Sequence, residues 1–287
     1  FVMEELEEEK VVGTSCIVSK VGGFEPFYAY RIEDCVHESK TLGIRKEVGI
    51  LHLVAEHSGP CEIGGLFLAP GRRKHGNGRL LSLFRFLFMT EYAERFEPLV
   101  IAEMRGVVDL EGRSPFWEAL GRNFFDMDFP KADYLSVKDK RFIADLMPKC
   151  PIYISLLPEA AREVIGKVHK DTNPALKMLL DEGFTYSGMV DIFEAGPIII
   201  VKLEDIRVVR ESKTAIVDEA ALDEIDSVDH IVSYPGDEFR ACVGKVMMRP
   251  DGGALIERGT AFALRVKKGD RIRFAPLKPY SAPGSAP

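Results

Sequence analysis

The chain has 287 residues, a formal net charge of −7 and a sequence pI near 5.5. This acidic balance argues against nucleic acid or an anionic membrane as the main partner, and no apolar run approaches the ~18 residues that span a bilayer. Its five cysteines are odd in number and lack metal-ligand spacing, so we expect reduced thiols, a cytoplasmic protein and no metal site.

The N-terminal part of the chain predicts strands. Residues 1–3 and 11–19 are apolar runs joined by a charged hairpin connection, and residues 47–55 predict another strand. Residues 24–46 mix aromatic and charged side chains without a clear period, so no element is predicted there. The chain begins inside a strand, and we expect further sequence to precede Phe1.

The segment of residues 66–90 carries the strongest functional signal. A short apolar strand leads into a basic, glycine-rich turn, and a strongly apolar helix follows. Gly76 and Gly78 allow a ligand to approach the main chain closely, and a helix N-terminus presents unpaired N–H groups. The basic residues 72–74 add full charges. The segment therefore predicts a site for a phosphate-bearing ligand.

Three glycine-rich phosphate motifs can be compared with this turn. A P-loop requires Lys-Ser/Thr where the chain has Asn77 and Gly78, and a dinucleotide fingerprint requires a third glycine where Leu81 stands. The remaining pattern, Arg73-x-x-Gly76-x-Gly78 between strand and helix, resembles the pyrophosphate loop of the GNAT acyltransferases. The alternative is a basic turn whose glycines serve only its tightness.

The middle of the chain alternates strands and helices. Residues 98–103 predict a buried strand, parallel to the preceding one if a right-handed crossover connects them. Ser114 and Pro115 predict the N-cap and first turn of a helix that ends at Gly121. A further helix is predicted over residues 138–146. The pattern predicts an α+β (α/β-like) fold with a mixed central sheet.

The C-terminal part has a different composition. From about residue 205 the sequence consists of short strands separated by Pro-Asp-Gly-Gly and Lys-Lys-Gly-Asp turns. We therefore divide the chain into a domain of residues 1–204 and a small β-rich domain of residues 205–287. The last residues, 279–287, form a Pro/Ser/Gly tail that is predicted to be disordered.

Seven sequence blocks follow one another between residues 102 and 197. They are Ala102-Glu-Met-Arg-Gly-Val-Val-Asp109, Gly112-Arg-Ser-Pro-Phe-Trp117, Phe124-Phe-Asp-Met-Asp-Phe129, Ala132-Asp-Tyr-Leu135, Phe142-Ile-Ala-Asp-Leu-Met-Pro148, Val164-Ile-Gly-Lys-Val-His169 and Asp191-Ile-Phe-Glu-Ala-Gly-Pro197. In this order they resemble the family blocks of arginine N-succinyltransferase. The resemblance runs from about residue 1 to residue 210 and is thin beyond. It implies a GNAT acyltransferase fold for residues 1–204, with the β-rich region appended.

The resemblance also implies an activity and its partners. An acyltransferase of this family acts in arginine catabolism and transfers succinyl from succinyl-CoA to the α-amine of L-arginine. Succinyl-CoA is then a co-substrate, and no tightly bound cofactor is expected. The family includes paired-subunit enzymes in which one chain also uses ornithine, so we expect a homo- or hetero-oligomer. The alternatives are N-acylation of ornithine or another amine, and a non-catalytic acyl-CoA-binding subunit.

Site residues follow from the resemblance, position by position. The residues expected to bind succinyl-CoA are Leu66, Leu68, Arg73, Gly76, Asn77 and Gly78. Leu66 lies on the splayed strand, where main-chain groups hold the pantetheine and thioester; its side chain fits a core role equally well. The first strand and helices of the GNAT fold are expected to precede Phe1.

His169 is the expected catalytic residue. The resemblance makes it the proton donor to the leaving sulfur. From the residues alone, it stands just before a helix capped by Thr172 or Asn173, where the neutral imidazole is favoured and can accept the amine proton and later donate it. A structural surface or core histidine is the alternative reading.

Glu103, Arg105 and Asp109 are the expected substrate-binding residues. They follow the central strand, where α/β sheets place ligands, and they offer carboxylates to a guanidinium and a guanidinium to an α-carboxylate. Further candidates are Asp126, Asp128, Asp191 and Glu194. For each of these residues, a solvated loop charge or a structural ion pair is the alternative.

Overall fold

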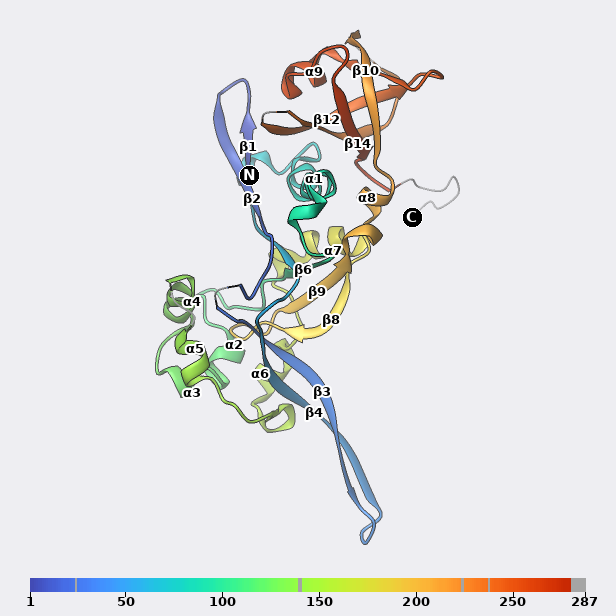
Figure 1. The fold of residues 1–287 in the computed structure, drawn as a ribbon. Helices are drawn as coiled ribbons and strands as arrows, with labels where there is room; N and C mark the ends of the chain where they lie inside the picture. The colour runs from blue at the N-terminus through green and yellow to red at the C-terminus, as the bar shows by residue number, and fades with distance from the viewer. Residues whose placement is uncertain (24, 139–140, 223–224, 237, 280–287) are drawn as a thin grey trace.

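A nine-stranded mixed sheet and a closed five-stranded barrel organise the computed structural model, which describes residues 1–23, 25–138, 141–222, 225–236 and 238–279. Figure 1 shows the barrel at one end of the molecule and a long two-stranded arm at the other, with the sheet and most helices between them. The predicted α+β class and mixed sheet are confirmed.

The sheet has the order β1-β2-β5-β6-β9-β8-β3-β4-β7. Its strands are β1 (Val2–Glu5), β2 (Lys10–Val18), β3 (Phe27–Ser39), β4 (Ile44–Glu56), β5 (Cys61–Leu68), β6 (Leu99–Glu103), β7 (Ile152–Tyr153), β8 (Thr185–Val190) and β9 (Pro197–Lys202). The pairs between neighbours are antiparallel except for β5 and β6, which are parallel. The predicted parallel relation of these two strands is therefore confirmed.

The parallel pair separates after two residues. β5 pairs with β6 only through Cys61 and Glu62, whereas its later residues pair with β2 alone. Gly65 and Leu66 stand opposite a single residue of β2, and Gly65 has a φ of +58°. This β-bulge bends β5, so the two strands diverge toward their C-terminal ends.

Arg85 donates hydrogen bonds to main-chain carbonyls beside the bulge. It lies on α1 (Asn77–Glu91) and is only 2% exposed. Its Nη1 donates to the carbonyl oxygens of Cys16 (3.3 Å) and Gly64 (3.1 Å), while Nε and Nη2 bond Ser82 on the same helix. Burial lowers the pKa of Arg85 to about 10, so the guanidinium remains charged at neutral pH. A buried cation thus satisfies carbonyl groups on both sides of the bulge.

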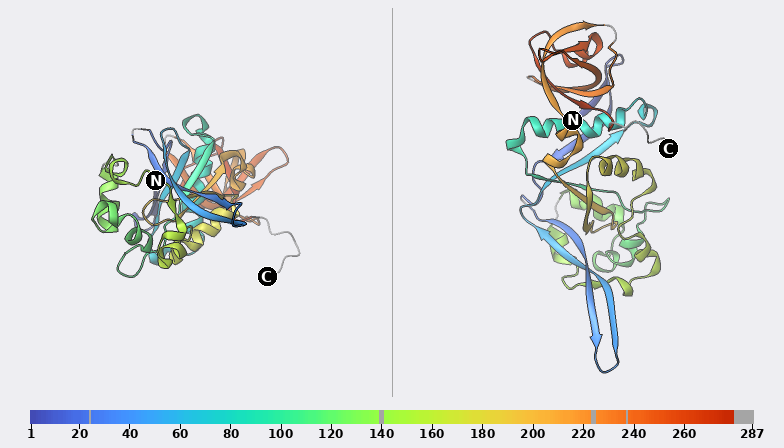
Figure 2. Two further views of the ribbon diagram at one scale, coloured as in Figure 1. Left: turned by 90° about the horizontal axis from the view of Figure 1, so that it is seen from below. Right: turned by 90° about the vertical axis from the view of Figure 1, so that its right-hand side faces the viewer.

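Helix α1 is apolar around most of its circumference because it is covered on two sides. Its buried residues share one core with Leu68 and Ala102 of the sheet and with Ile231 and Ala275 of the barrel. Figure 2 shows the helix lying between these two structures. The prediction of a largely buried helix is confirmed, and the barrel provides the second covering surface.

A second core lies between the β3–β4 side of the sheet and five short helices. These are α2 (Pro115–Ala119), α3 (Arg122–Phe125), α4 (Phe129–Lys138), α5 (Arg141–Leu146) and α6 (Glu159–Val164). Ser114 caps α2 by accepting the Trp117 N–H at 3.2 Å, as predicted. The helix predicted over residues 138–146 is confirmed in its later part as α5, whereas α4 before it was not predicted; Asp128 begins α4 by accepting the Lys131 N–H, and residues 139–140 lie outside the described part.

The arm is the hairpin of β3 and β4, which Figures 1 and 2 show projecting from the sheet. The sequence predicted no element in residues 24–46, and this was wrong, because β3 and the start of β4 lie there. Beyond the core-facing part of each strand, apolar side chains such as Val36, Leu42 and Ile44 are exposed. A ribbon without a buried face lacks the alternation of apolar and polar residues by which a strand is recognised.

The barrel closes in the order β10-β13-β12-β11-β14. Its elements are β10 (Lys213–Leu222), β11 (Asp229–Pro235), β12 (Phe239–Met248), β13 (Gly253–Glu257), α9 (Arg258–Leu264) and β14 (Arg271–Pro276). The β-rich character was predicted, but α9 was not. The proposed boundary after residue 204 stays a prediction, and residues 280–287 of the predicted disordered tail lie outside the described residues. No helix in the described part is long and apolar enough to cross a membrane.

A buried ion pair attaches the barrel to the sheet domain. Glu182 follows α7 (Asn173–Asp181), and its Oε1 accepts a hydrogen bond from Arg207 Nη2 at 2.7 Å. Arg207 begins α8 (Arg207–Arg210) and donates through Nη1 to the Pro276 carbonyl of the barrel at 3.2 Å. Both charges are almost fully buried, so each depends on the other for solvation.

Arg85→Met should destabilise the protein. The change removes a buried guanidinium and the donors of two main-chain carbonyls, which we expect to lower the free energy of unfolding by about 2–4 kcal/mol. The measurement is urea denaturation followed by circular dichroism. The exposed Arg95, changed to Met, is the control and should shift stability by less than ~0.5 kcal/mol. Equal midpoints for Arg85→Met and the wild-type protein would refute the role of Arg85.

Candidate functional site

The glycine-rich turn leads directly into the N-terminus of α1. Gly76 is the N-cap residue with a φ of +79°, and no side chain caps this terminus. The side-chain amide of Asn77 instead donates to the Arg72 carbonyl at 3.1 Å. Because the first-turn N–H groups of Gly78 and Arg79 lie beyond the reach of intrahelical carbonyls, they remain available to an anion.

The three basic residues of the turn have different partners. Arg72 pairs with Glu5 and Glu8 of the β1–β2 hairpin, so its charge is largely used within the protein. Arg73 Nε donates to the Leu68 carbonyl at 3.0 Å, which ties the turn to the end of β5. Lys74 is exposed. The turn therefore keeps its shape through Arg72 and Arg73 and can offer Lys74 and the remaining Arg73 donors to a ligand.

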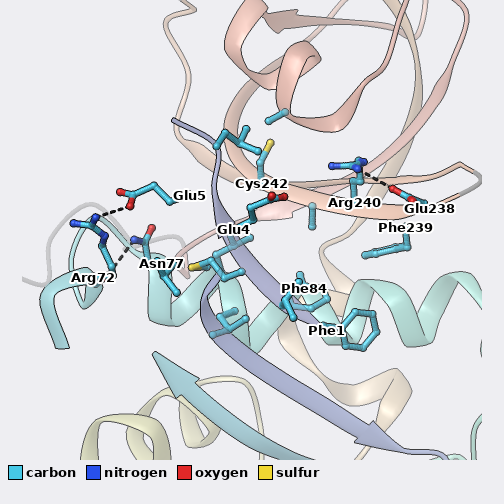
Figure 3. A pocket seen from close by; sticks show the side chains of 18 residues that line it. Phe1, Glu4, Glu5, Arg72, Asn77, Phe84, Glu238, Phe239, Arg240 and Cys242 are labelled. Atoms are coloured by element: carbon cyan, nitrogen blue, oxygen red, sulfur yellow. Dashed lines mark hydrogen bonds and ion pairs between the residues drawn. The ribbon is translucent and has the colours of Figure 1, made fainter. Parts of the chain in front are cut away.

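A cavity of about 680 Å³ adjoins the turn. It lies between the β1–β2 hairpin, α1 and β12, and Figure 3 shows Arg72 and Asn77 at one end and Phe239 with Arg240 at the other. The residues that line it do not include His169 or Glu194. This cavity is thus a neighbour of the phosphate turn and is separate from the predicted catalytic residue.

His169 lies where the sequence predicted, before α7. It is the N-cap of a single 3₁₀ turn (Lys170–Thr172) that leads into the helix, and its side chain is 14% exposed. Its Nδ1 accepts the Asp171 N–H at 3.2 Å, and the Asp171 carboxylate lies 3.7 Å from the same nitrogen. Since a neutral imidazole carries one proton, this hydrogen bond assigns that proton to Nε2.

A main-chain hydrogen bond places His169 beside the loop that follows β6. Its backbone N–H donates to the Arg105 carbonyl, just beyond the end of β6, at 2.9 Å. The preceding residue, Val168, packs on the core that contains Leu68, Ala102 and Met104. His169 therefore lies beside the loop that follows β6, and its neighbour Val168 joins the core to which the end of β5 also contributes.

Glu194 reaches the same loop from the opposite side. Its Oε2 accepts the Gly106 N–H at 2.8 Å, and its side chain is 12% exposed. The Arg105 carbonyl and the Gly106 N–H are the two ends of one peptide group, which point in opposite directions. A single peptide group thus holds the His169 main chain on one side and the Glu194 carboxylate on the other.

Glycine is required where these two loops touch. A Cβ on Gly106 would lie 2.5 Å from the Glu194 carbonyl oxygen, and one on Gly196 would lie 2.0 Å from the Met104 carbonyl oxygen. Neither oxygen belongs to a flexible side chain, so neither loop can retreat cheaply. The close backbone contact sets the position of the Glu194 carboxylate relative to Arg105.

Two neighbouring carboxylates have strongly perturbed acidities. Burial raises the pKa of Asp191 to about 6, although its oxygens accept the N–H groups of Phe193 and Glu194. Burial, and next the Asp191 charge, raise the pKa of Glu194 to about 7. From the sequence, both residues are only candidates for guanidinium binding, because the burial of a loop carboxylate is not visible there.

The three predicted substrate residues have different surroundings. Glu103 ends β6 and is exposed. Arg105 is 57% exposed, and its Nε lies 3.9 Å from Glu194 Oε1. The Asp109 carboxylate accepts the N–H and the Nε–H of Arg113, both at 2.8 Å, and these bonds lower its pKa. The Asp109 carboxylate is already engaged in a turn, whereas Arg105 lies next to the Glu194 carboxylate. The substrate roles of all three residues stay predictions.

The chain matches two known family descriptions. Residues 1–208 match "Arginine N-succinyltransferase beta subunit", and residues 213–276 match the C-terminal domain of the same subunit. The arginine N-succinyltransferase of Yersinia enterocolitica is 43% identical over 280 residues, which cover 96% of this chain and 81% of that protein. Arginine N-succinyltransferase subunit beta of Pseudomonas aeruginosa is 43% identical over 290 residues with the same coverage.

A solved structure is similar in fold. It is described as the structure of arginine/ornithine succinyltransferase subunit AI from Pseudomonas aeruginosa. The similarity has a TM-score of 0.86 and a sequence identity of 32%, and it covers 96% of this chain and 80% of that chain. The agreement extends over nearly all of the sequence, the C-terminal part included.

The tautomer of His169 can be measured directly. In the neutral ring, we expect Nε2 to be protonated and Nδ1 to have no proton, because Nδ1 accepts the Asp171 N–H. Long-range ¹H–¹⁵N spectra of the histidine side chains distinguish the two nitrogens, and the signal missing in His169→Asn identifies the residue. A proton on Nδ1 would contradict the arrangement.

Proposed function

The chain belongs to the arginine N-succinyltransferase family, and on this premise we propose that the gap between β5 and β6 holds the reacting thioester. The chain is a succinyl-CoA-dependent acyltransferase that transfers succinyl to the α-amine of L-arginine. The observation that carries this function is family membership over residues 1–208, joined to 43% identity across 96% of the chain. The geometry then suggests a role for each group in the site.

The arrangement is consistent with a GNAT-type acyltransferase fold. Such a fold needs two parallel strands that separate so that a ligand can bond the exposed main chain, followed by a helix whose N-terminus receives a phosphate. β5 and β6 separate after Glu62, and α1 follows β5 through the glycine-rich turn. We assign the pantetheine and thioester to the main chain of Leu66 and Leu68 on the bulged part of β5.

The pyrophosphate of CoA is assigned to the turn. The uncapped first turn that begins at Gly76 offers the main-chain N–H groups of Gly78 and Arg79, and the helix dipole adds a partial positive charge. Arg73 and Lys74 supply cationic groups beside it. An acidic protein requires such a local cationic site to hold a polyanionic co-substrate.

The acceptor amino acid is assigned to the loop after β6. Arg105 projects from it and can receive the α-carboxylate, and Glu103 lies at the end of the same strand as a carboxylate for the cationic side chain. Asp109 has a weaker case because Arg113 already occupies its carboxylate. Ornithine is the second candidate acceptor, since the solved relative is described as an arginine/ornithine succinyltransferase.

His169 is assigned to the leaving sulfur. A thiolate develops as the C–S bond breaks, and a hydrogen-bond donor directed at it lowers the barrier. The Nε2–H tautomer set by Asp171 is the one that can donate from the outer edge of the ring.

An oligomer also fits the surface of the molecule. The β3–β4 arm exposes Val36, Leu42 and Ile44. A lone two-stranded ribbon is only marginally stable in water, so contact with another subunit would stabilise the arm. We retain a homo- or hetero-oligomer as part of the proposal, and the cytoplasmic location stays a prediction.

The function is tested by a thiol-release assay that crosses succinyl- and acetyl-CoA with arginine, ornithine and lysine. We expect succinyl-CoA with arginine to give the highest kcat/KM. A site that bonds the free succinyl carboxylate should reject acetyl-CoA by roughly 10²-fold or more. Comparable kcat/KM values for the two acyl donors would contradict the assignment to succinyl transfer.

Gly78→Val tests the pyrophosphate site. A Cβ on Gly78 has only Leu68 Cδ2 nearby, at 3.9 Å, so the fold should survive while the branched side chain obstructs the first turn. We expect succinyl-CoA affinity, measured by calorimetry, to fall roughly 10- to 100-fold, because a hydrogen bond to a charged group contributes about 1.5–3 kcal/mol. Gly71→Val in the same turn, with open space around its Cβ, is the control. Unchanged affinity in Gly78→Val would place the pyrophosphate elsewhere.

A further inference from the structure

The proposed reaction requires a proton acceptor that the His169 assignment does not supply. The α-amine of arginine is largely an ammonium near neutral pH, and an ammonium has no lone pair with which to attack. In its neutral form, His169 carries a proton on Nε2, while Nδ1 is bonded to the Asp171 N–H. Neither nitrogen is therefore free to take a proton from the substrate.

We propose that Glu194 is the general base that removes the first proton from the α-ammonium of the acceptor amino acid. The proposal rests on the function assigned above and adds a catalytic residue to it. Glu194 is held by the peptide group that also anchors His169, so the base and the donor are positioned by one structural element.

Arg105 explains how the substrate amine reaches Glu194. The α-carboxylate and α-ammonium of an amino acid are attached to the same carbon atom. Arg105 Nε and Glu194 Oε1 are 3.9 Å apart, so an amino acid whose carboxylate pairs with the exposed Arg105 guanidinium can place its ammonium beside the Glu194 carboxylate. With Oε2 bonded to Gly106, Oε1 is the oxygen that faces this pair.

The charges around Glu194 suit a base that works near neutral pH. Burial and the charges of Asp191 and Asp133 raise its pKa, while the Gly106 hydrogen bond and Arg105 lower it, with a result of about 7. A base with this pKa is ionised in a useful fraction and also has real affinity for a proton. An ordinary exposed glutamate, with a pKa near 4.3, is a much weaker base.

The protons and bonds balance over one turnover. The ammonium transfers one proton to Glu194, and the amine lone pair forms the C–N bond to the thioester carbon. The C–S bond breaks with its electron pair on sulfur, and the second surplus proton of the attacking nitrogen ends on sulfur to give the CoA thiol. Glu194 then releases its proton to solvent.

Glu194→Gln in the full-length enzyme tests the assignment. The amide keeps an oxygen for the Gly106 N–H but cannot accept the substrate proton. We expect kcat to fall by roughly 10²–10³ at pH 7, with succinyl-CoA affinity unchanged. The loss should shrink toward pH 9.5, because the arginine amine then loses its proton to solvent and no longer needs the base. A structural defect would not be rescued by alkaline pH.

The unfolding temperature of Glu194→Gln distinguishes a buried base from a residue that stabilises the fold. Because burial raises the pKa of Glu194 above its unfolded value, its contribution to stability is present at low pH and is lost as pH rises through about 7. Gln carries no charge to bury. We expect the unfolding temperature of Glu194→Gln at pH 8 to equal or exceed that of the wild-type enzyme, whereas loss of a stabilising ion pair would lower it.

Two further variants complete the test. Asp270→Asn is the matched control. Like Glu194, Asp270 has a carboxylate that accepts a backbone N–H, but it lies in a turn of the barrel, so this variant should leave turnover unchanged. Asp191→Asn removes a charge that raises the pKa of Glu194, so the rising limb of kcat/KM should move to lower pH. This shift remains measurable if Glu194→Gln fails to fold.

The outcomes separate this proposal from the function on which it rests. If the wild-type enzyme does not form succinylarginine and free CoA thiol, the proposed function fails. If the wild-type enzyme is active but Glu194→Gln keeps turnover within about threefold and retains the limb near pH 7, Glu194 is not the base. For a variant that does not fold, an unmoved limb in Asp191→Asn overturns the proposal.

Discussion

A buried guanidinium keeps the middle of the sheet open. Two parallel strands that start side by side would normally continue to pair, because unpaired main-chain groups in a protein interior are costly. Arg85 removes part of that cost by donating to the carbonyls of Cys16 and Gly64 beside the bulge. β5 can then bend away from β6 after Glu62. The gap, the direction in which the glycine-rich turn leaves β5, and the exposed end of β6 all depend on this bend.

The chemistry depends on a second constraint of the same kind, at the end of β6. The Arg105–Gly106 peptide group bonds the His169 main chain through its oxygen and the Glu194 carboxylate through its N–H. These residues come from distant parts of the chain, so neither their separation nor their relative orientation is local. Gly106 and Gly196 let the loops approach to main-chain contact, which holds the carboxylate in a largely dry environment. The raised pKa of Glu194 is a direct result of that burial.

The barrel contributes by fixing the helix that starts at the glycine-rich turn. Helix α1 has apolar residues on most of its surface, and it would expose several of them if only the sheet covered it. The barrel covers the other side through Ile231, Ala275 and Leu277. The Glu182–Arg207 pair, bonded to Pro276, fastens the two parts together. A rigidly held helix keeps its N-terminal donors in place, as anion binding by main-chain groups requires.

The sequence alone determined the features that arise within a few neighbouring residues: the glycine-rich turn and its helix, the Ser114 cap, the parallel strand after the crossover, and the place of His169 before α7. Only the tertiary structure decided the rest. The arm could not be predicted because its exposed strands have no alternating pattern, whereas the start of α4 is a local feature at which Asp128 accepts the Lys131 N–H. The His169 tautomer is a local feature, because Asp171 lies two residues further along the chain. The burial of Arg85 and the acidity of Glu194 depend on residues distant in sequence, among them Gly64 and Gly106, because desolvation and hydrogen bonding act through space.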